Sequence, residues 1–128
     1  MLTDQDILGC RDFADTIGVQ GWPVEAHIKG DVKFVFAPRE SRGFNEIPYR
    51  IIVPQKVDNL LVAGRCASMS HDGQSSARVS GPCFVMGQAA GTAADLALAT
   101  RSAPRAISVA ELQRRLRASG ANLGPSAA

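Results

Sequence analysis

The sequence predicts an α/β fold (α+β for an isolated piece), with a small β segment followed by two main helices. Residues 22–36 alternate between apolar and polar side chains, residues 60–63 form a continuous apolar run, and residues 82–99 form a long stretch of small and apolar side chains. Alternation is typical of a half-buried strand, and a short apolar run is typical of a strand buried on both faces in a parallel sheet. The long stretch has the length and composition of a buried helix.

The composition is that of one folded globular domain. The 128 residues are 45% hydrophobic and 20% charged, with 14 basic against 12 acidic side chains. The net charge of +2 is too weak to indicate binding to nucleic acid or to an anionic membrane. Because Gln88, Thr92 and Asp95 interrupt the stretch 82–99, we expect it to be a buried helix and not a membrane span.

The cysteines and histidines predict neither a metal site nor a disulfide framework. Cys10, Cys66 and Cys83 are odd in number and share no metal-type spacing, so packing is the simplest role for Cys66. His27 and His71 have no companion at the spacing of metal ligands. Free thiols are the rule in reducing compartments, and we therefore expect a cytoplasmic protein.

The first residues predict a short helix and a further helical turn. Thr3 followed by Asp6 indicates an N-cap hydroxyl with an acid in the first turn, and Gly9 is expected to end this helix. Residues 11–17 are expected to form another turn of helix.

A β-hairpin is predicted next. Residues 22–28 and 32–36 both alternate with period two, and residues 30–31 have the composition of a turn. Residues 37–47 are polar and are expected to form a loop, followed by a short strand at 49–53.

The apolar run 60–63 predicts a buried strand that leads into a site. It ends at Gly64 and is followed by the polar segment 65–79, which is rich in serine and glycine and is expected to be a functional loop. In α/β proteins, ligands bind at the carboxyl ends of such strands. The segment after this strand is therefore the place where the sequence predicts a ligand.

Two helices are predicted after this loop. Ser80 is expected to cap the long helix, with Pro82 near its first position. Ser108 and Glu111 have the spacing of a capping box for a last helix, which Gly120 is expected to end.

One face of the long helix is predicted to consist of small residues. At 100° per residue, five positions fall on the same side: Gly87, Ala90, Gly91, Ala94 and Leu98. A glycine inside a helix costs about 1 kcal/mol relative to alanine, so a strand or a flat ligand is expected to approach this face closely. Plain packing of the helix on a sheet is the alternative.

The block 59–94 resembles the C-terminal signature of a family of flavoproteins. It reads NLLVAGRC over 59–66, then Ser-His at 70–71, Arg78, and MGQAAGTAA over 86–94. In this pattern the chain is similar to the FAD-dependent oxidoreductases, in particular to the glutathione-reductase-like flavoproteins. Further segments that extend the resemblance over nearly the whole chain are 24–27, 47–54 and 108–120.

The resemblance implies an FAD site built from two segments. The backbone of Ala63, Gly64 and Arg65 is implied beside the ribityl and pyrophosphate groups; many members have an acid where this chain has Arg65, so its contact is implied through the backbone. The start of the long helix is implied at the pyrimidine edge of the flavin, where a helix N-terminus stabilises negative charge. The cofactor-binding positions implied on this helix are Ser80, Gly81, Pro82, Phe84 and Gly87.

The resemblance also implies two catalytic candidates in the loop. Arg78 could hold a carboxylate or the reduced flavin, and His71 could move a proton. Each has a structural alternative. His71 precedes the turn pair at 72–73 and could be solvated, whereas Arg78 could pair with Asp72 or with the loop backbone.

The G-x-G-x-x-G fingerprint of dinucleotide-binding domains is absent from the sequence. We therefore expect an incomplete flavoprotein fold that needs a missing N-terminal dinucleotide-binding domain, in cis or in trans, to hold FAD. The expected parts are a substrate-side β segment with a short N-terminal helix (1–56), an FAD-binding strand, loop and helix with a capped last helix (57–123), and a loose tail (124–128). The alternative is a gene remnant or a non-catalytic module that forms homo-oligomers through the surface left uncovered.

Overall fold

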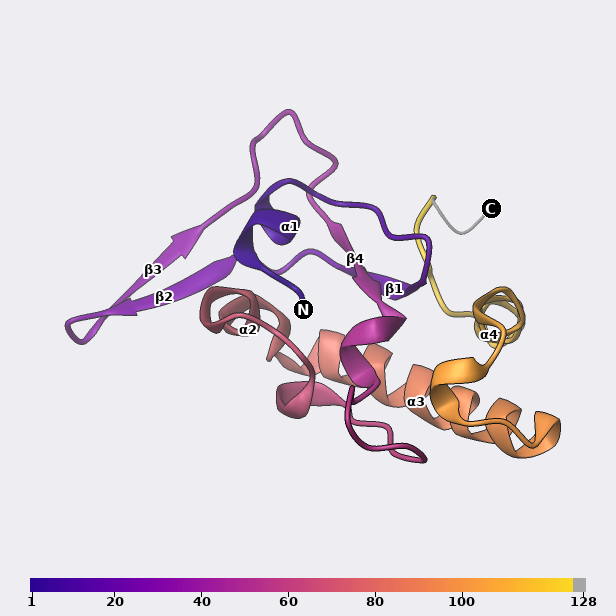
Figure 1. Cartoon of the computed structure of the whole chain (residues 1–128). Coiled ribbons are helices and arrows are strands. Elements are labelled where there is room, and N and C mark those ends of the chain that lie inside the picture. Colours follow the sequence, from indigo (N-terminus) through magenta and orange to yellow (C-terminus); the bar gives the residue numbers. More distant parts are fainter. Residues whose placement is uncertain (126–128) are drawn as a thin grey trace.

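Residues 1–125, apart from the side chain of Ile28, are described by a computed structural model with two small antiparallel sheets and four α-helices (Figure 1). The strands are β1 (Thr16–Gln20), β2 (Val24–Ile28), β3 (Asp31–Val35) and β4 (Asn45–Pro48). The helices are α1 (Asp4–Leu8), α2 (His71–Ala77), α3 (Ser80–Thr100) and α4 (Val109–Ala118). Short 3-10 turns cover Tyr49–Ile52, Gly64–Cys66 and Pro104–Ala106. This architecture confirms the predicted mixed α/β class.

The predicted start of the chain is right for α1 and wrong for the segment after it. The Thr3 hydroxyl accepts from the N–H of Asp6, which confirms the predicted N-cap. The Asp6 carboxylate also accepts from the N–H of Thr3 at 3.0 Å, so the two residues form a capping box. Residues 11–17 form no helical turn, because the chain there runs into β1, which pairs antiparallel with β4. Pairing with a strand far along the chain thus outweighs the local helical signal.

Strand β4 occupies part of the segment that was expected to be a loop. The strand predicted at 49–53 is a 3-10 turn instead, and all four residues of β4 are buried. Its polar side chains have partners inside the core. The N–H of Phe13 donates to Oε2 of Glu46 at 2.7 Å, and Nε2 of Gln20 donates to Oδ1 of Asn45 at 2.6 Å. Because these buried residues are polar, hydropathy could not reveal the strand.

The β2–β3 hairpin is confirmed, with its turn one residue earlier than expected. Lys29 and Gly30 have φ values of 51° and 83°, as a two-residue hairpin turn requires. The hairpin projects from the body of the molecule (Figure 1), and β3 is exposed over its whole length. The register places Phe34 opposite Glu25, so the apolar row of β3 shares a face with the polar row of β2.

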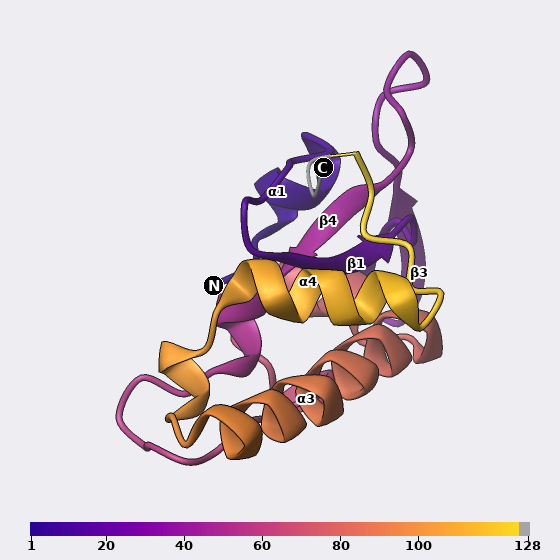
Figure 2. The same ribbon diagram turned by 90° about the vertical axis from the view of Figure 1, so that its right-hand side faces the viewer.

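Helix α3 is confirmed, but its buried face is not the predicted one. It runs beside α4 on one side of the β1–β4 sheet (Figure 2), and its buried residues are Pro82, Met86, Ala89, Ala93, Leu96 and Ala97. The small-residue stripe faces away from this core: Gly87, Gly91 and Ala94 are exposed and Leu98 is 79% exposed. A Cβ built on Gly87 or Gly91 would meet nothing within 4 Å. The two glycines of the stripe therefore face open space, whereas Ala90 is partly buried against the core and shares a groove with Leu61.

The strand predicted at 60–63 does not form. These residues lie in an irregular segment, Leu60 is 44% exposed, and the N–H of Val62 donates to the carbonyl of Ile52 at 3.0 Å. A parallel strand needs a neighbouring strand to accept its hydrogen bonds, and the described residues provide none beside this run.

The loop predicted at 65–79 contains α2. The Ser70 hydroxyl caps this helix by accepting from the N–H of Gly73 at 3.0 Å. The chain before it is tied to the N-terminus, because the N–H of Leu2 donates to the carbonyl of Ser68 and the N–H of Ser70 donates to the carbonyl of Leu2. Serine and glycine are weak helix formers, so tertiary contacts account for this helix better than propensity does.

The two long helices begin close to the predicted positions. Val79, and not Ser80, is the N-cap of α3, and no side chain caps this end. Ser108 caps α4 as predicted by accepting from the N–H of Glu111, but the carboxylate of Glu111 binds Arg114 and Arg115 and does not complete the predicted capping box. Gly120 follows the end of α4 with φ 82°. The predicted tail extends to residues 126–128, which lie outside the described residues. In the described part of the chain, no helix combines the length and apolar character needed to cross a membrane.

Raising the pH is expected to destabilise the fold through Tyr49. Burial raises the pKa of Tyr49 to about 12, and its hydroxyl donates to the carbonyl of Pro104 at 2.7 Å. Because the pKa is raised on folding, the neutral phenol stabilises the fold below pH 10, and this contribution is lost as the pH rises through about 12. The Tyr49→Phe variant should lack this alkaline loss and be about 1 kcal/mol less stable at neutral pH.

Urea unfolding at a series of pH values measures this effect, and phenolate absorbance reports the ionisation directly, because the chain has a single tyrosine. A Tyr49 that ionises at pH 10 in the folded protein would contradict the prediction.

Candidate functional site

The two segments implied to hold the cofactor lie next to each other. Gly64 has φ 66°, a left-handed conformation that favours glycine. A Cβ built on Gly64 would lie 3.4 Å from Sγ of Cys83, in the first turn of α3. Residues 63–65 and 80–84, which are 15 or more residues apart in the sequence, thus meet in one region.

The first turn of α3 is open at the surface. Its N-terminal N–H groups have no side-chain cap, and Ser80, Gly81 and Phe84 are exposed. A shallow pocket of about 580 Å³ lies here, lined by residues 79–82 and 85 of the helix start and by residues 19–22 at the end of β1. This end of the helix can therefore stabilise negative charge on a bound group.

His71 and Arg78 lie at opposite ends of α2 and do not meet. His71 is the exposed first residue of the helix, and Arg78 is its C-cap, about 10 Å further along the axis. Arg78 pairs with neither Asp72 nor the loop backbone. Its Nη2 lies 2.9 Å from Nε2 of His27 and 3.4 Å from Oε1 of Glu25, both on β2. The sequence placed His27 on a polar strand face but gave no sign that Arg78 would reach it.

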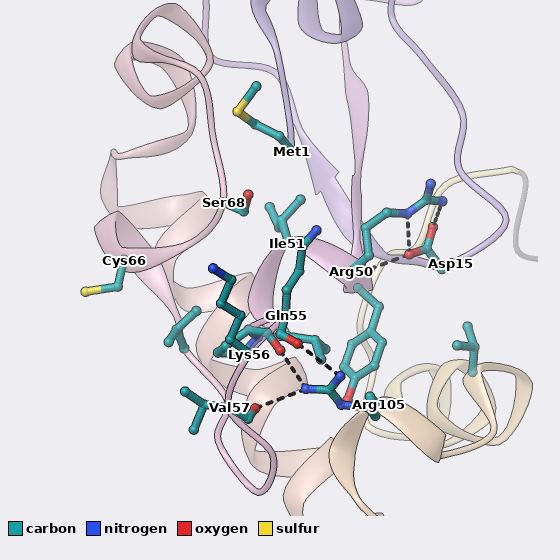
Figure 3. Close-up of a pocket in the computed structure, with 15 residues that line it drawn as sticks. Met1, Asp15, Arg50, Ile51, Gln55, Lys56, Val57, Cys66, Ser68 and Arg105 are labelled. Carbon is teal, nitrogen blue, oxygen red and sulfur yellow. Dashed lines mark hydrogen bonds and ion pairs between the residues drawn. The ribbon is translucent and has the colours of Figure 1, made fainter.

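A larger pocket of about 900 Å³ lies on the other side of the 64–66 turn (Figure 3). Its walls are the 3-10 turn at Tyr49–Ile52, the loop 53–57, and Val62, Cys66 and Ser68. The close-up shows Cys66 and Ser68 on one wall and Arg50 and Arg105 on the other. The predicted FAD-binding block thus also lines this pocket, which the sequence did not predict.

The guanidinium of Arg105 in this pocket is already paired. The guanidinium of Arg105 donates to the carbonyls of Pro54, Gln55 and Val57 and forms an ion pair with Asp58 at 2.9 Å. Arg105 therefore holds the loop 54–58 in place. The sequence around Arg105 contains no motif that indicates this role.

Arg50 and Asp15 form a second closed pair at the rim of this pocket (Figure 3). Burial by itself would raise the pKa of Asp15, but the hydrogen bonds from Arg50 outweigh it and lower that pKa. Arg50 is thus already neutralised by a partner, whereas the ammonium-bearing side chain of Lys56 also lines the pocket.

The described residues contain no group of three or more histidine, cysteine, aspartate or glutamate side chains that could hold a metal ion.

Replacing Gly64 by alanine is expected to destabilise the chain by about 1–2 kcal/mol, because φ 66° is strained for any residue with a Cβ. The 3.4 Å contact with Cys83 is ordinary van der Waals distance and adds little. The free energy of unfolding in urea measures this cost. Gly87→Ala is the matched control and should stabilise the chain by up to about 1 kcal/mol, since that helical position is open. An equal effect of both substitutions would contradict the assignment of strain to Gly64.

Comparison with known proteins gives one family match for this chain. The model of the family described as FAD dependent oxidoreductase matches residues 1–116. Neither curated proteins nor solved structures show a match to the chain. The matched range includes both segments of the candidate site, the hairpin and most of α4.

Proposed function

Because this chain belongs to the family of FAD-dependent oxidoreductases, we propose that it is the C-terminal portion of such an enzyme. In this role it supplies the flavin-end pocket and substrate-side residues for hydride transfer to or from FAD. The observation that carries the proposal is the contact between Gly64 and Cys83, which joins the two segments implied to hold the cofactor.

The residues at this contact fit a flavin. The left-handed turn at Gly64 brings main chain to the surface without a side chain, and the uncapped start of α3 offers N–H groups of Ser80 and Gly81 to an anionic or electron-rich edge. Bound FAD would supply the two-electron chemistry. The chain itself would bind and orient the cofactor through Ala63, Gly64 and Arg65 on one side and through the first turns of α3 on the other.

We infer that a dinucleotide-binding domain, in cis or in trans, completes the site. Two features support this. The apolar run 60–63 lacks a neighbouring strand within residues 1–125, and the small-residue stripe of α3 is uncovered. A groove of about 520 Å³ joins them, with Leu61 on one side and Ala90, Ala94 and Leu98 on the other. A strand laid beside 60–63 would cover the groove and offset the cost of Gly87 and Gly91.

To test this, the chain is mixed with FAD and with a dinucleotide-binding domain from another family member. The mixture is separated by size-exclusion chromatography, and the flavin absorbance that elutes together with this chain is measured. The chain alone is expected to retain little FAD, and the pair is expected to retain it in about equal molar amount. Gly91→Leu should keep the chain alone as stable as the wild type or stabilise it by up to about 1 kcal/mol, because the position is open and leucine favours a helix more than glycine does, but it should abolish coelution.

Ala118→Leu is the matched control, since it adds the same side chain at an exposed helical position outside the family match. This variant should coelute like the wild type. The proposal would be contradicted if the isolated chain retained FAD fully. It would also be contradicted if flavin coeluted with the Gly91→Leu variant and the added domain as it does with the wild type.

Self-association of a non-catalytic module is the second candidate. It is favoured by the exposed side chains of Phe84 and Leu98, which are 76% and 79% accessible, and by the exposed aromatic residues of the hairpin. Light scattering decides between a monomer and a homo-oligomer at micromolar concentration. A clean monomer would contradict this candidate and leave the first one standing.

A further inference from the structure

A cluster of three polar side chains lies on the hairpin face beside α2. Glu25 and His27 are two residues apart on β2 and so project on the same side, and Arg78 reaches them from the end of α2. Nη2 of Arg78 lies 2.9 Å from Nε2 of His27 and 3.4 Å from Oε1 of Glu25. Nε2 of His27 also lies 3.0 Å from the same Oε1. The three atoms thus form a closed triangle.

Nε2 of His27 cannot satisfy both neighbours at once. A ring nitrogen of imidazole offers either one N–H to donate or one lone pair to accept with. The guanidinium of Arg78 can only donate and the carboxylate of Glu25 can only accept. His27 therefore either accepts from Arg78 with its proton on Nδ1, or donates to Glu25 with a proton on Nε2.

We propose that Glu25 and His27 are positioning residues for Arg78 and that the proton on His27 decides how firmly Arg78 is held. With Nε2 unprotonated, Arg78 has two acceptors. With Nε2 protonated, Arg78 keeps only the longer contact to Glu25, and in the imidazolium form it also faces a like charge.

The other titratable side chains of α2 are His71 and Asp72, which are exposed at the end of this helix opposite Arg78. On β3, the residues opposite Glu25 and His27 are Phe34 and Val32, which are apolar. Helix α1 also contacts β2, and its acids are Asp4 and Asp6, the second of which is bound by Arg11.

The consequence for the site is that a proton on Nε2 of His27 is coupled to the binding of an anion by Arg78. When His27 takes up a proton on Nε2, Arg78 loses an acceptor and becomes available to a carboxylate on the substrate side. This consequence rests on the proposed function, whereas the triangle itself is a property of the chain alone.

The test is the ¹⁵N NMR spectrum of the imidazole rings, recorded on the full chain at a pH where both histidines are neutral. In the wild type, neutral His27 is expected to carry its proton on Nδ1. In Arg78→Met the ratio of the Nδ1–H to the Nε2–H tautomer of His27 should fall by roughly two- to twelve-fold, which is the effect of one hydrogen bond. Arg78→Lys keeps a donor and should retain most of the wild-type ratio. His71, exposed and outside the cluster, is the internal reference.

A neutral wild-type His27 with its proton on Nε2 would overturn the proposal, and so would a ratio that is the same in the wild type and Arg78→Met. If Arg78→Met does not fold, the wild-type and Arg78→Lys spectra decide alone. Neither spectrum requires flavin. If the tautomer prediction fails, the proposed function is therefore unaffected. If the chain never completes an FAD site, the tautomer result still holds.

Discussion

Replacing Met86 by alanine is expected to lower the free energy of unfolding by about 2–5 kcal/mol. Met86 is fully buried in the second turn of α3, a helix that packs against β1 and α4. The substitution removes apolar contacts and leaves a cavity that a packed core fills only in part. Since a domain of this size is stable by only about 5–15 kcal/mol in total, much of the chain could be unfolded at room temperature.

Leu98→Ala is the control for Met86→Ala, because Leu98 is on the same helix and 79% exposed. Its effect on the isolated chain should stay within about 0.5 kcal/mol. Urea unfolding monitored by circular dichroism gives both values, and a similar slope in the two variants shows that the same transition is compared. If Leu98→Ala were the more damaging change, the buried face of α3 would be the small-residue stripe and not the one described above.

Replacing Gly73 by alanine is expected to cost about 1–3 kcal/mol through steric overlap. A Cβ on Gly73 would lie 2.5 Å from the carbonyl oxygen of Leu2, and this oxygen already accepts from the N–H of Ser70. Because the obstacle is backbone and not the end of a flexible side chain, either α2 or the N-terminal segment has to move. The loss should appear in urea unfolding and as faster amide hydrogen exchange in α2 and at residues 2–8.

Gly81→Ala is the matched control for Gly73→Ala. Both glycines lie in the first turn of a helix, but a Cβ on Gly81 would meet nothing within 4 Å. This variant should be as stable as the wild type or slightly more stable, because alanine loses less backbone freedom on folding. Equal destabilisation by the two substitutions would show that helix position, and not the contact with Leu2, sets the cost.

The local features of the fold could be predicted because they depend on residues close in sequence. The capping box of Thr3 and Asp6, the hairpin, the extent of α3 and the cap at Ser108 all involve hydrogen bonds over a few residues. The turn of the hairpin was misplaced by one residue because Lys29 adopts positive φ, which sequence seldom indicates for lysine.

The candidate site could be predicted in part. Residues 63–65 and 80–84 were expected to form one site, and the structure places Gly64 beside Cys83. The pocket at the start of α3 is lined by residues 79–82 and 85 but not by residues 63–65. The partners of Arg78 could not be predicted, since His27 and Glu25 are more than 50 residues away from it. The large pocket at Arg50 and Arg105 depends on the same kind of long-range contact.

The sequence by itself determined the mixed α/β class, the place of the long helix and the family resemblance, because composition, periodicity and motif spacing are properties of the chain. Only the tertiary structure decided which face of α3 is buried and that 60–63 is not a strand. Helix α3 carries small or apolar residues on almost every side, so its periodicity does not select a face. A strand exists only when a neighbour accepts its hydrogen bonds, and that depends on which segments the fold brings alongside.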